Sequence, residues 1–326
     1  MRVAVVGGGA WGTALASHCV RAAHSVHLWM RREESVQDVL GHRQNRSHLP
    51  GIPLSGDLVV SSDLASVVGG AEIVVAAVPS EWSRVIYREV HPVAPIQAPL
   101  VSATKGLETG TLLRMSQIAA QEAPGRRLAV VSGPSFALEV ARELPTALVV
   151  ASADPALAES VQQALSTRVL RVYRSDDVVG VEMGGALKNV IAIAAGIVDG
   201  LGYGHNTVAA LVTRGLAEIT RLAVAQGGRA DTLAGLAGLG DLVLTCTGGL
   251  SRNRQVGQAL GAGRTLAEAT KGVIAEGVHT TLAACALAET AAIDMPIAQA
   301  MKRVLYEGKP PRQAVDELML RTLKRE

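Results

Sequence analysis

The sequence is poor in aromatic residues and in net charge, and each shortage narrows what the protein can be. Aromatic residues make up 2% of the 326-residue chain while hydrophobic residues reach 48%, so the cores are built from Ala, Val, Leu and Ile. The formal net charge of +2 provides no electrostatic footprint for nucleic acid or for an anionic membrane, although a local basic cluster suits a small phosphorylated ligand. We therefore expect no nucleic-acid partner. The length favours two domains, because domains usually span about 100–200 residues.

Cysteine and histidine are also scarce. The three cysteines, Cys19, Cys246 and Cys285, are odd in number and lack a short spacing, which argues against a disulfide framework or a zinc knuckle. The eight histidines are scattered, without an H-x-x-x-H pair or a carboxylate cluster, so no metal site is expected. Cysteines without a framework indicate a reducing, cytoplasmic location.

Long apolar runs are missing as well. The start of the chain, from Met1 to Ala16, superficially resembles a signal peptide, but three adjacent glycines and Trp11 interrupt its apolar helix. The longest apolar stretch, Val190 to Val198, is far short of the ~20 residues that a spanning helix needs. We therefore expect no membrane insertion.

What the first half does contain is an alternation of β-rich runs with helical patterns. Several of the runs, such as 73–78, are continuously apolar, which is typical of strands buried on both faces of a parallel sheet. The pattern predicts an α/β fold, a Rossmann-type doubly wound, mostly parallel sheet. A helix is predicted over 11–23, and the predicted strands are 2–6, 25–30, 57–60, 72–78, 99–103 and 128–131.

The second half changes character near residue 175, where β-branched runs give way to Ala/Leu segments with helical spacing. We predict a dinucleotide-binding domain over 1–177 and an all-helical C-terminal domain for substrate binding and catalysis over 178–326. A glycine- and proline-containing segment at 41–56 is interpreted as a loop that forms a flexible cover near a cofactor. The helices predicted in the second half are 208–226, 266–271, 279–291 and 297–306.

A glycine motif lies between the first predicted strand and the first helix. Gly7, Gly9 and Gly12 fit G-x-G-x-x-G, in which the first glycine permits a tight turn, the second lets the backbone approach a pyrophosphate and the third lets helix and strand pack closely. The phosphates would then lie at a helix N-terminus, where free N–H groups and the helix dipole favour an anion. The alternative is a glycine-rich turn that binds nothing. The strand before the motif and the helix after it favour the dinucleotide.

The end of the second predicted strand distinguishes between the two nicotinamide cofactors. NAD is usually held there by an acidic residue, but this chain has Arg31 and Arg32. Guanidinium groups match a 2′-phosphate, so NADP(H) is favoured and NAD(H) remains possible. The alternative is an exposed charged turn in which the arginines pair with Glu33 and Glu34.

Four further polar or glycine-rich segments follow apolar elements, and they carry the candidate chemistry. Lys105 and Ser135 follow predicted strands, whose carboxyl ends bind ligands in doubly wound sheets. Lys188 lies in an otherwise apolar helix, where it is either a surface lysine with a buried stem or a buried functional group. The segments are 103–108, 132–137, 182–189 and 238–254.

Taken together, these segments resemble the bacterial NAD(P)-dependent glycerol-3-phosphate dehydrogenase family over essentially the whole chain. The resemblance rests on GGGAWGTA at 7–14, ATKGLE at 103–108, SGPSFA at 132–137, the stretch around Lys188, and GLGD at 238–241 leading into SRN at 251–253. It implies reversible reduction of dihydroxyacetone phosphate to sn-glycerol 3-phosphate for phospholipid synthesis. It also implies a Rossmann domain followed by a helical domain, and a homodimer.

The resemblance further implies a role for individual positions. Lys188 matches the catalytic acid/base, and His48 stands where the family usually has an aromatic residue that contacts the cofactor. Positions that match substrate contacts are Lys105, Gly133, Ser135, Lys188, Asp241, Ser251, Arg252 and Asn253. Positions assigned to the cofactor, including the glycine loop, are Gly7, Gly9, Ala10, Trp11, Gly12, Arg31, Arg32, His48, Lys105, Ala137, Arg252, Ile274 and Glu276.

Two other functions are considered beside this one. The first is a related dehydrogenase acting on a 3-hydroxy acid or a sugar phosphate acid. Arg252 and Asn253 favour a phosphorylated substrate, and the family resemblance favours dihydroxyacetone phosphate in particular. The second is a redox sensor that binds NADPH without catalysis. Lys188, Asp241 and Arg252 argue against a sensor, because a sensor needs no proton donor.

Overall fold

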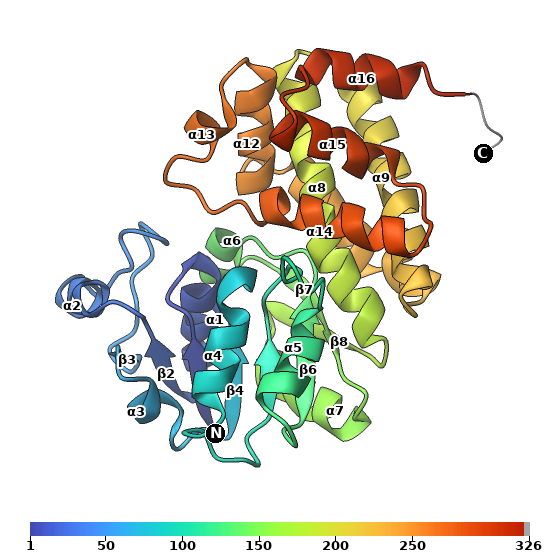
Figure 1. Cartoon of the computed structure of the whole chain (residues 1–326). Coiled ribbons are helices and arrows are strands. Elements are labelled where there is room, and N and C mark those ends of the chain that lie inside the picture. The colour runs from blue at the N-terminus through green and yellow to red at the C-terminus, as the bar shows by residue number, and fades with distance from the viewer. Residues whose placement is uncertain (323–326) are drawn as a thin grey trace. The chain divides into compact units, whose positions relative to one another are not determined.

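The computed structural model describes residues 1–322, and these form two compact units. The N-terminal unit comprises Met1–Lys105 and Leu113–Glu182. The helical unit comprises Gly106–Leu112 and the chain from Met183 onward. Figure 1 shows the helices and strands of both units.

The N-terminal unit is built on one eight-stranded sheet with the order β3-β2-β1-β4-β5-β6-β7-β8. All neighbouring strands are parallel except β6 and β7, which are antiparallel. The reversal of strand order on either side of β1 and β4 is that of a doubly wound sheet, so the predicted fold class is confirmed. The strands are β1 (Arg2–Val6), β2 (Ser25–Trp29), β3 (Val59–Ser61), β4 (Ile73–Ala76), β5 (Leu100–Ser102), β6 (Leu128–Ser132), β7 (Thr146–Ala151) and β8 (Leu170–Ser175).

Two strands, β7 and β8, are absent from the sequence-based prediction, which ends its strands at residue 131. β8 is an edge strand in which buried and exposed residues alternate at first, so it lacks the continuous apolar run that marked the central strands. β7 does have such a run, TALVVA, and was missed all the same; its antiparallel pairing with β6 is a tertiary feature that the run does not show.

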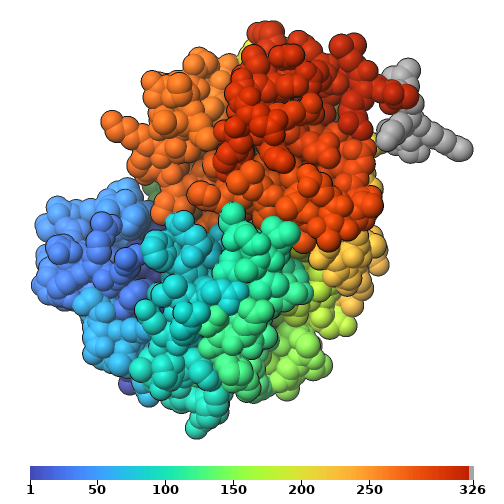
Figure 2. Space-filling view, in the orientation of Figure 1, coloured from blue at the N-terminus to red at the C-terminus, as the bar shows by residue number. Residues whose placement is uncertain are grey.

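Helices cover both faces of this sheet, as alternation along the strands requires. In β1, Val3 and Val5 pack into a core with α1, α2, α6 and α7, whereas Ala4 and Val6 pack into a second core with α3, α4 and α5. Figure 2 shows the face that α4 and α5 cover, in cyan and green. The helices of this unit are α1 (Ala10–Arg21), α2 (Glu33–His42), α3 (Leu64–Val68), η1 (Ser80–Trp82), α4 (Ser83–Val90), α5 (Met115–Glu122), α6 (Ala137–Ala141) and α7 (Pro155–Leu165).

The helical unit contains helices and no strand among the residues described, which agrees with the predicted all-helical region. Helix α8 begins before the unit boundary and continues into it. The elements are α8 (Val178–Gly200), α9 (His205–Ala225), α10 (Ala230–Ala234), η2 (Leu236–Gly240), α11 (Asp241–Thr247), α12 (Arg252–Gly261), α13 (Leu266–Ala269), α14 (Glu276–Thr290), α15 (Pro296–Tyr306) and α16 (Pro311–Met319).

Helix α8 is longer than its apolar core suggested. The run Val190–Val198 looked too short to span a membrane, but the complete helix has 23 residues and a stretch with mean hydropathy 1.5. That stretch is entirely buried, as it is in the core helix of a soluble protein. A low aromatic content leaves small side chains to fill this core, and close helix contacts follow from that.

Glycines bring α8 and α12 together. A Cβ at Gly257 would overlap the carbonyl oxygen of Ile193, and a Cβ at Gly261 would lie 2.5 Å from that of Ile197. Reciprocally, a Cβ at Gly196 would overlap the carbonyl oxygen of Arg254. Neither helix therefore has room for a larger residue along this contact, which the sequence analysis did not identify.

The segment 41–56, interpreted as a flexible cover, is instead tied to the N-terminal unit by buried side chains. Leu49 and Ile52 pack with Ala14 of α1 and Ala141 of α6, and Leu54 enters the larger core. Asn45 is 1% exposed. The segment is irregular, as predicted, but it has a defined packing.

Candidate functional site

The glycine loop of the N-terminal unit has little free space on its inner side. Gly7 has φ +125°, a conformation that favours glycine, and its N–H donates to the carbonyl of Trp29 at 3.1 Å. A Cβ at Gly12 would overlap the carbonyl oxygen of Gly7. Gly12 is thus required for α1 to start directly behind β1.

The outer side of the same loop is open. A Cβ at Gly9 would meet nothing within 4 Å, and Gly9 caps α1 without any side-chain hydrogen bond to the first turn. Ala10 and Trp11 begin the helix, and the buried Nε1 of Trp11 has no hydrogen-bond partner among the described residues. Free N–H groups at an uncapped helix start, next to open space, fit the pyrophosphate of a dinucleotide.

Asn45 supports this loop from the segment 43–58, the irregular stretch between α2 and β3, and this role was not predicted from the sequence. Its Nδ2 donates to the carbonyl of Gly8 at 2.9 Å and to Oγ1 of Thr13 at 2.8 Å. Its Oδ1 accepts from Oγ of Ser47 and from N–H of His48, each at 3.2 Å. One buried amide therefore joins the glycine loop, helix α1 and the residue before Leu49. A single asparagine in a polar loop carries no sequence signal of such a role.

The two arginines after β2 are both exposed, and they differ in surroundings. The guanidinium carbon of Arg31 lies 4.7 Å from the ring centroid of Trp82, a cation–π distance. Arg32 caps α2. Glu33, one of the two residues considered as ion-pair partners, accepts hydrogen bonds from Ser62 and Gln37, which lower the pKa of its carboxyl.

Residues after β5 and β6 meet at the carboxyl ends of these strands, as predicted. Nζ of Lys105 donates to the carbonyl of Gly133 at 2.7 Å and lies 3.4 Å from Oγ of Ser135. Gly133 has φ +126°, and a Cβ there would approach Cα of Leu148 at 3.2 Å. Ala137 is the first residue of α6. The structure thus brings together three of the residues predicted to bind substrate.

In the helical unit, Lys188 is buried and ion-paired. It is 6% exposed, so the surface-lysine interpretation is wrong. Its Nζ donates to Oδ1 of Asp241 at 2.5 Å and to Oγ1 of Thr245 at 2.8 Å. Asp241 is 1% exposed, and Thr245 was not predicted. A buried charge needs such partners, because an unpaired ammonium in an apolar core is strongly destabilising.

Glycines again explain how this pair forms across 53 residues of sequence. A Cβ at Gly184 of α8 would lie 2.5 Å from the carbonyl oxygen of Ala237, and Gly238 packs against the backbone of Leu233. The turn η2 therefore lies directly on α8, and Asp241 follows it as the first residue of α11. The GLGD segment is thus a packing motif that delivers a carboxylate to Lys188.

A second network of polar groups joined by hydrogen bonds lies at the start of α12. Nδ2 of Asn253 donates to Oδ1 of Asn189 at 3.0 Å, and Oδ1 of Asn253 accepts from N–H of Gly277 at 2.9 Å. Oγ of Ser251 caps α12 by accepting from N–H of Arg254. The side chains of Ser251 and Asn253 are therefore engaged within the protein, whereas Arg252 is exposed at the helix start.

The remaining predicted residues lie near the starts of elements. His48 is exposed in the segment 43–58, and Ile274 is 49% exposed just before α14. Glu276 is the first residue of α14 and is partly buried. Within residues 1–322, no group of three or more His, Cys, Asp or Glu side chains is arranged to hold a metal ion.

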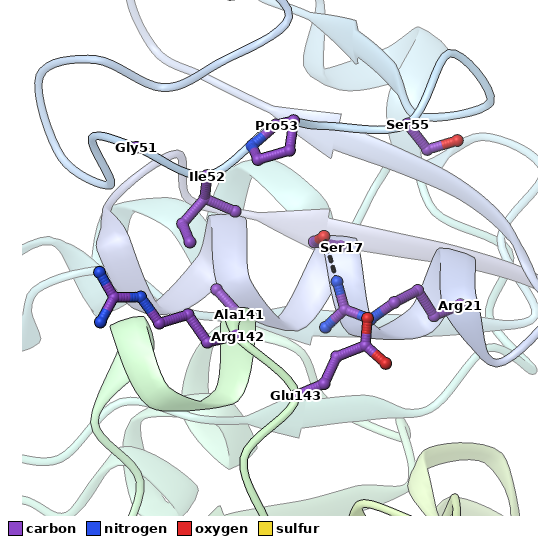
Figure 3. Close-up of a pocket in the computed structure, with 9 residues that line it drawn as sticks. All are labelled: Ser17, Arg21, Gly51, Ile52, Pro53, Ser55, Ala141, Arg142 and Glu143. Atoms are coloured by element: carbon purple, nitrogen blue, oxygen red, sulfur yellow. Dashed lines mark hydrogen bonds and ion pairs between the residues drawn. The ribbon is translucent and has the colours of Figure 1, made fainter.

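A separate pocket of about 460 Å³ lies in the N-terminal unit beside α1 and α6 (Figure 3). None of the predicted site residues lines it. In Figure 3 the guanidinium of Arg21 faces Ser17, with a hydrogen bond of 2.8 Å to Oγ, and lies 3.5 Å from Glu143. The pocket lining is Ser17, Arg21, Gly51, Ile52, Pro53, Ser55, Ala141, Arg142 and Glu143.

A doubly wound sheet with this glycine loop, followed by helices that bury a paired lysine, defines a dinucleotide-dependent oxidoreductase. Family models described as the N-terminus and the C-terminus of NAD-dependent glycerol-3-phosphate dehydrogenase match residues 2–158 and 177–316. The chain belongs to the NAD-dependent glycerol-3-phosphate dehydrogenase family. The resemblance stated from the sequence motifs is thereby confirmed.

Individual relatives agree along the full chain. A glycerol-3-phosphate dehydrogenase [NAD(P)+] of Geobacter sp. (strain M21) is 51% identical over 100% of this chain and 98% of its own length. One from Koribacter versatilis (strain Ellin345) is 52% identical over 98% of this chain and 97% of its own. The crystal structure of glycerol-3-phosphate dehydrogenase from Coxiella burnetii has a TM-score of 0.95 and 40% identity, covering 98% of this chain and 99% of that one.

Proposed function

We propose that this protein is a glycerol-3-phosphate dehydrogenase that uses NAD(P)H to reduce dihydroxyacetone phosphate to sn-glycerol 3-phosphate, reversibly, and so supplies glycerophospholipid synthesis. The observation that carries the proposal beyond family membership is the buried ion pair of Lys188 and Asp241. A dinucleotide-binding protein without chemistry has no need to bury a lysine and its counter-ion.

In this proposal, Lys188 moves the proton. The bound nicotinamide supplies the hydride to the C2 carbonyl of the substrate, and negative charge develops on that oxygen. Asp241 and Thr245 accept hydrogen bonds from Nζ of Lys188, which restricts the position of this group. An ammonium is the form that donates a proton in the reductive direction; in the oxidative direction the neutral amine would accept one.

The phosphate of the substrate would be held at the start of α12. We assign this role to the guanidinium of Arg252 and to the free N–H groups of the first turn. The Asn253 side chain bonds Asn189 and Gly277, which fixes the helix start, and it remains a proposed contact of the phosphate. Ser251, Lys105, Gly133 and Ser135 remain proposed substrate contacts.

The cofactor would be held by the glycine loop of the N-terminal unit, with NADP(H) preferred. Gly7, Gly9 and Gly12 shape the loop, Ala10 and Trp11 start the helix, and Ala137 starts α6. Arg31 and Arg32 are available for a 2′-phosphate because both are exposed. The further proposed contacts are His48, Lys105, Arg252, Ile274 and Glu276.

We also propose that residues 1–177 act as the dinucleotide-binding domain and 178–326 as the substrate-binding domain. A homodimer in the cytoplasm is the proposed form of the enzyme. Burial raises the pKa of all three cysteine thiols, those of Cys19 and Cys246 to about 12, which leaves them protonated in a reducing compartment.

One assay tests the proposed reaction. Purified protein is mixed with NADPH and dihydroxyacetone phosphate, and the nicotinamide absorbance is followed; the assay is repeated with NADH. We expect absorbance to fall with both cofactors and faster with NADPH. Loss of absorbance only with another carbonyl substrate would favour the rival dehydrogenase. Cofactor binding without any turnover would favour the sensor.

A further inference from the structure

The glycine loop has a freedom that its own residues cannot restrain. Gly8 and Gly9 are adjacent glycines, and glycine adopts either sign of φ at little cost. The peptide between them can therefore rotate so that either its C=O or its N–H faces the open side of the loop. A carbonyl facing that side would repel a pyrophosphate, whereas an N–H would attract it.

Asn45 removes this freedom in the structure. Its Nδ2 donates to the carbonyl of Gly8 at 2.9 Å. In a planar trans peptide the C=O and the following N–H point in opposite directions, and the described chain has no cis peptide. With the Gly8 carbonyl held toward Asn45, the N–H of Gly9 is directed away from it. The open space beside Gly9 lies where a Cβ would meet nothing within 4 Å.

Asn45 is itself held in place on every side. The second hydrogen of its amide bonds Oγ1 of Thr13, a residue that is completely buried in α1. Its carbonyl accepts from Ser47 and His48. Leu49, four residues on, packs against α1 and α6, so the backbone that carries Asn45 is anchored by apolar burial. A fully satisfied buried amide of this kind specifies one geometry.

We propose that Asn45 is a positioning residue for the dinucleotide: it fixes the orientation of the Gly8–Gly9 peptide so that an N–H, and not a carbonyl, faces the pyrophosphate. The proposal rests on dinucleotide binding as proposed above. It requires an amide at position 45, because only an amide can donate to Gly8 and Thr13 while accepting from Ser47 and His48.

The test is Asn45→Asp, which keeps the shape and removes both donors. NADP⁺ binding is measured directly by calorimetry, and turnover is measured in the assay above. We expect the Kd for NADP⁺ to rise about 10- to 100-fold, as expected for losing a buried hydrogen bond and freeing the peptide. The turnover number at saturating cofactor and the KM for dihydroxyacetone phosphate should change less than about threefold, since the lost hydrogen bonds act on the glycine loop and Asn45 is assigned no part in proton transfer.

Two controls separate positioning from general destabilisation. Thr13→Val removes the other acceptor of the amide but leaves Gly8 held, so it should weaken NADP⁺ binding much less than Asn45→Asp does. A protonated aspartic acid can donate one bond, so NADP⁺ binding by Asn45→Asp should improve as the pH falls from 8 to 6, relative to wild type measured in parallel. A purely structural role would give equal losses for both variants and no such recovery.

Each outcome decides the question. Binding of NADP⁺ by folded Asn45→Asp within twofold of wild type would overturn the proposal, as would equal losses in Asn45→Asp and Thr13→Val. If Asn45→Asp does not fold, Asn45→Ser removes the amide without burying a charge, and the same expected loss and the same contradicting result apply. Because binding is measured without turnover, a wild type that binds NADP⁺ but reduces no dihydroxyacetone phosphate would refute the proposed reaction alone.

Discussion

The two units use glycine in the same way but with different results. In the N-terminal unit, Gly7 and Gly12 let the loop close on itself while Gly9 leaves space on the outside. In the helical unit, Gly196 and Gly257 are covered by the backbone of the opposite helix. Missing side chains thus leave open space beside the loop in one unit and make a closed contact in the other. The surrounding backbone, and not the glycine itself, decides which.

The largest expected effect comes from a substitution in the helical unit, and it tests whether the proposed proton transfer can be lost while the proposed cofactor binding of the N-terminal unit is kept. Lys188→Ala removes the proposed proton donor and its ion pair with Asp241. We expect turnover to fall by about a thousandfold, the range of general acid–base catalysis, while NADPH still binds. Lys302→Ala, on a more exposed lysine of α15, is the matched control and should keep its turnover. Near-normal turnover of Lys188→Ala would eliminate Lys188 as the acid/base.

A bulky residue at Gly12 should have the converse effect. Gly12→Val forces α1 away from the carbonyl of Gly7, so we expect NADPH affinity to fall about a hundredfold while the helical unit stays folded. Affinity is measured by calorimetry and folding by the helical circular-dichroism signal. Gly41→Ala, on an exposed helix position where a Cβ meets nothing within 4 Å, should bind normally. Unchanged affinity in Gly12→Val would show that the tight contact with Gly7 is dispensable.

The closed glycine contact is tested by Gly257→Ala. The added methyl group has no room between α8 and α12, so we expect a loss of about 3 kcal/mol in the free energy of unfolding of the helical unit. Calorimetric melting measures it. Gly204→Ala places the same methyl group in open space at the start of α9 and should change stability little. Equal melting of the two variants would contradict the close packing.

The smallest effect concerns a carboxylate in the helical unit. Glu218 is 2% exposed and accepts from the N–H of Ile297 and Ala298 at the start of α15. Burial raises the pKa of Glu218 to about 7, and the nearby Asp294 raises it further. The two backbone hydrogen bonds and Arg221 act in the opposite direction and lower this pKa. In the unfolded chain a glutamate has a pKa of about 4.3. The protonation of Glu218 therefore contributes fully to the free energy of unfolding below that pH, and this contribution is lost as the pH rises through about 7.

Glu218→Gln removes this dependence and keeps an acceptor for Ile297. We expect the stability of wild type relative to the variant to fall by on the order of 2 kcal/mol between pH 5.5 and pH 8. Chemical denaturation at both pH values measures the difference. A difference that stays constant or grows with pH would mean that Glu218 is ionised in the folded protein at pH 5.5.

The glycine loop and the strand before it could be predicted from the sequence, because each depends on residues that are close together in the chain. Gly7 and Gly12 were identified because a strand, a glycine loop and a helix follow one another directly. Strand β1 was placed at its observed bounds for the same reason. Lys188 and Asp241 were linked only through the family resemblance, because their own neighbours do not show that η2 brings them together.

The features that could not be predicted are contacts between residues that are far apart in the sequence. Asn45 resembles any polar loop residue until its amide is seen on Gly8. Arg31 lies over the ring of Trp82 although the two residues are 51 positions apart in the sequence. Neither apolar nor helical periodicity connects them. The glycines of α8 and α12 look like defects in two helices until the helices are placed together.

The contact between α8 and α12 has a further consequence, which concerns alignment. Asn253 meets Asn189, Gly257 meets Ile193 and Gly261 meets Ile197, so each step of four residues on one helix matches a step of four on the other. Neighbouring residues are about 100° apart around a helix. If the contact shifted by one residue, the helix would have to turn by that angle, and a side chain would then occupy the place of each glycine. The glycine contacts thus fix the register of α8 against α12, and with it the positions of Lys188 and Asn189 relative to the start of α12.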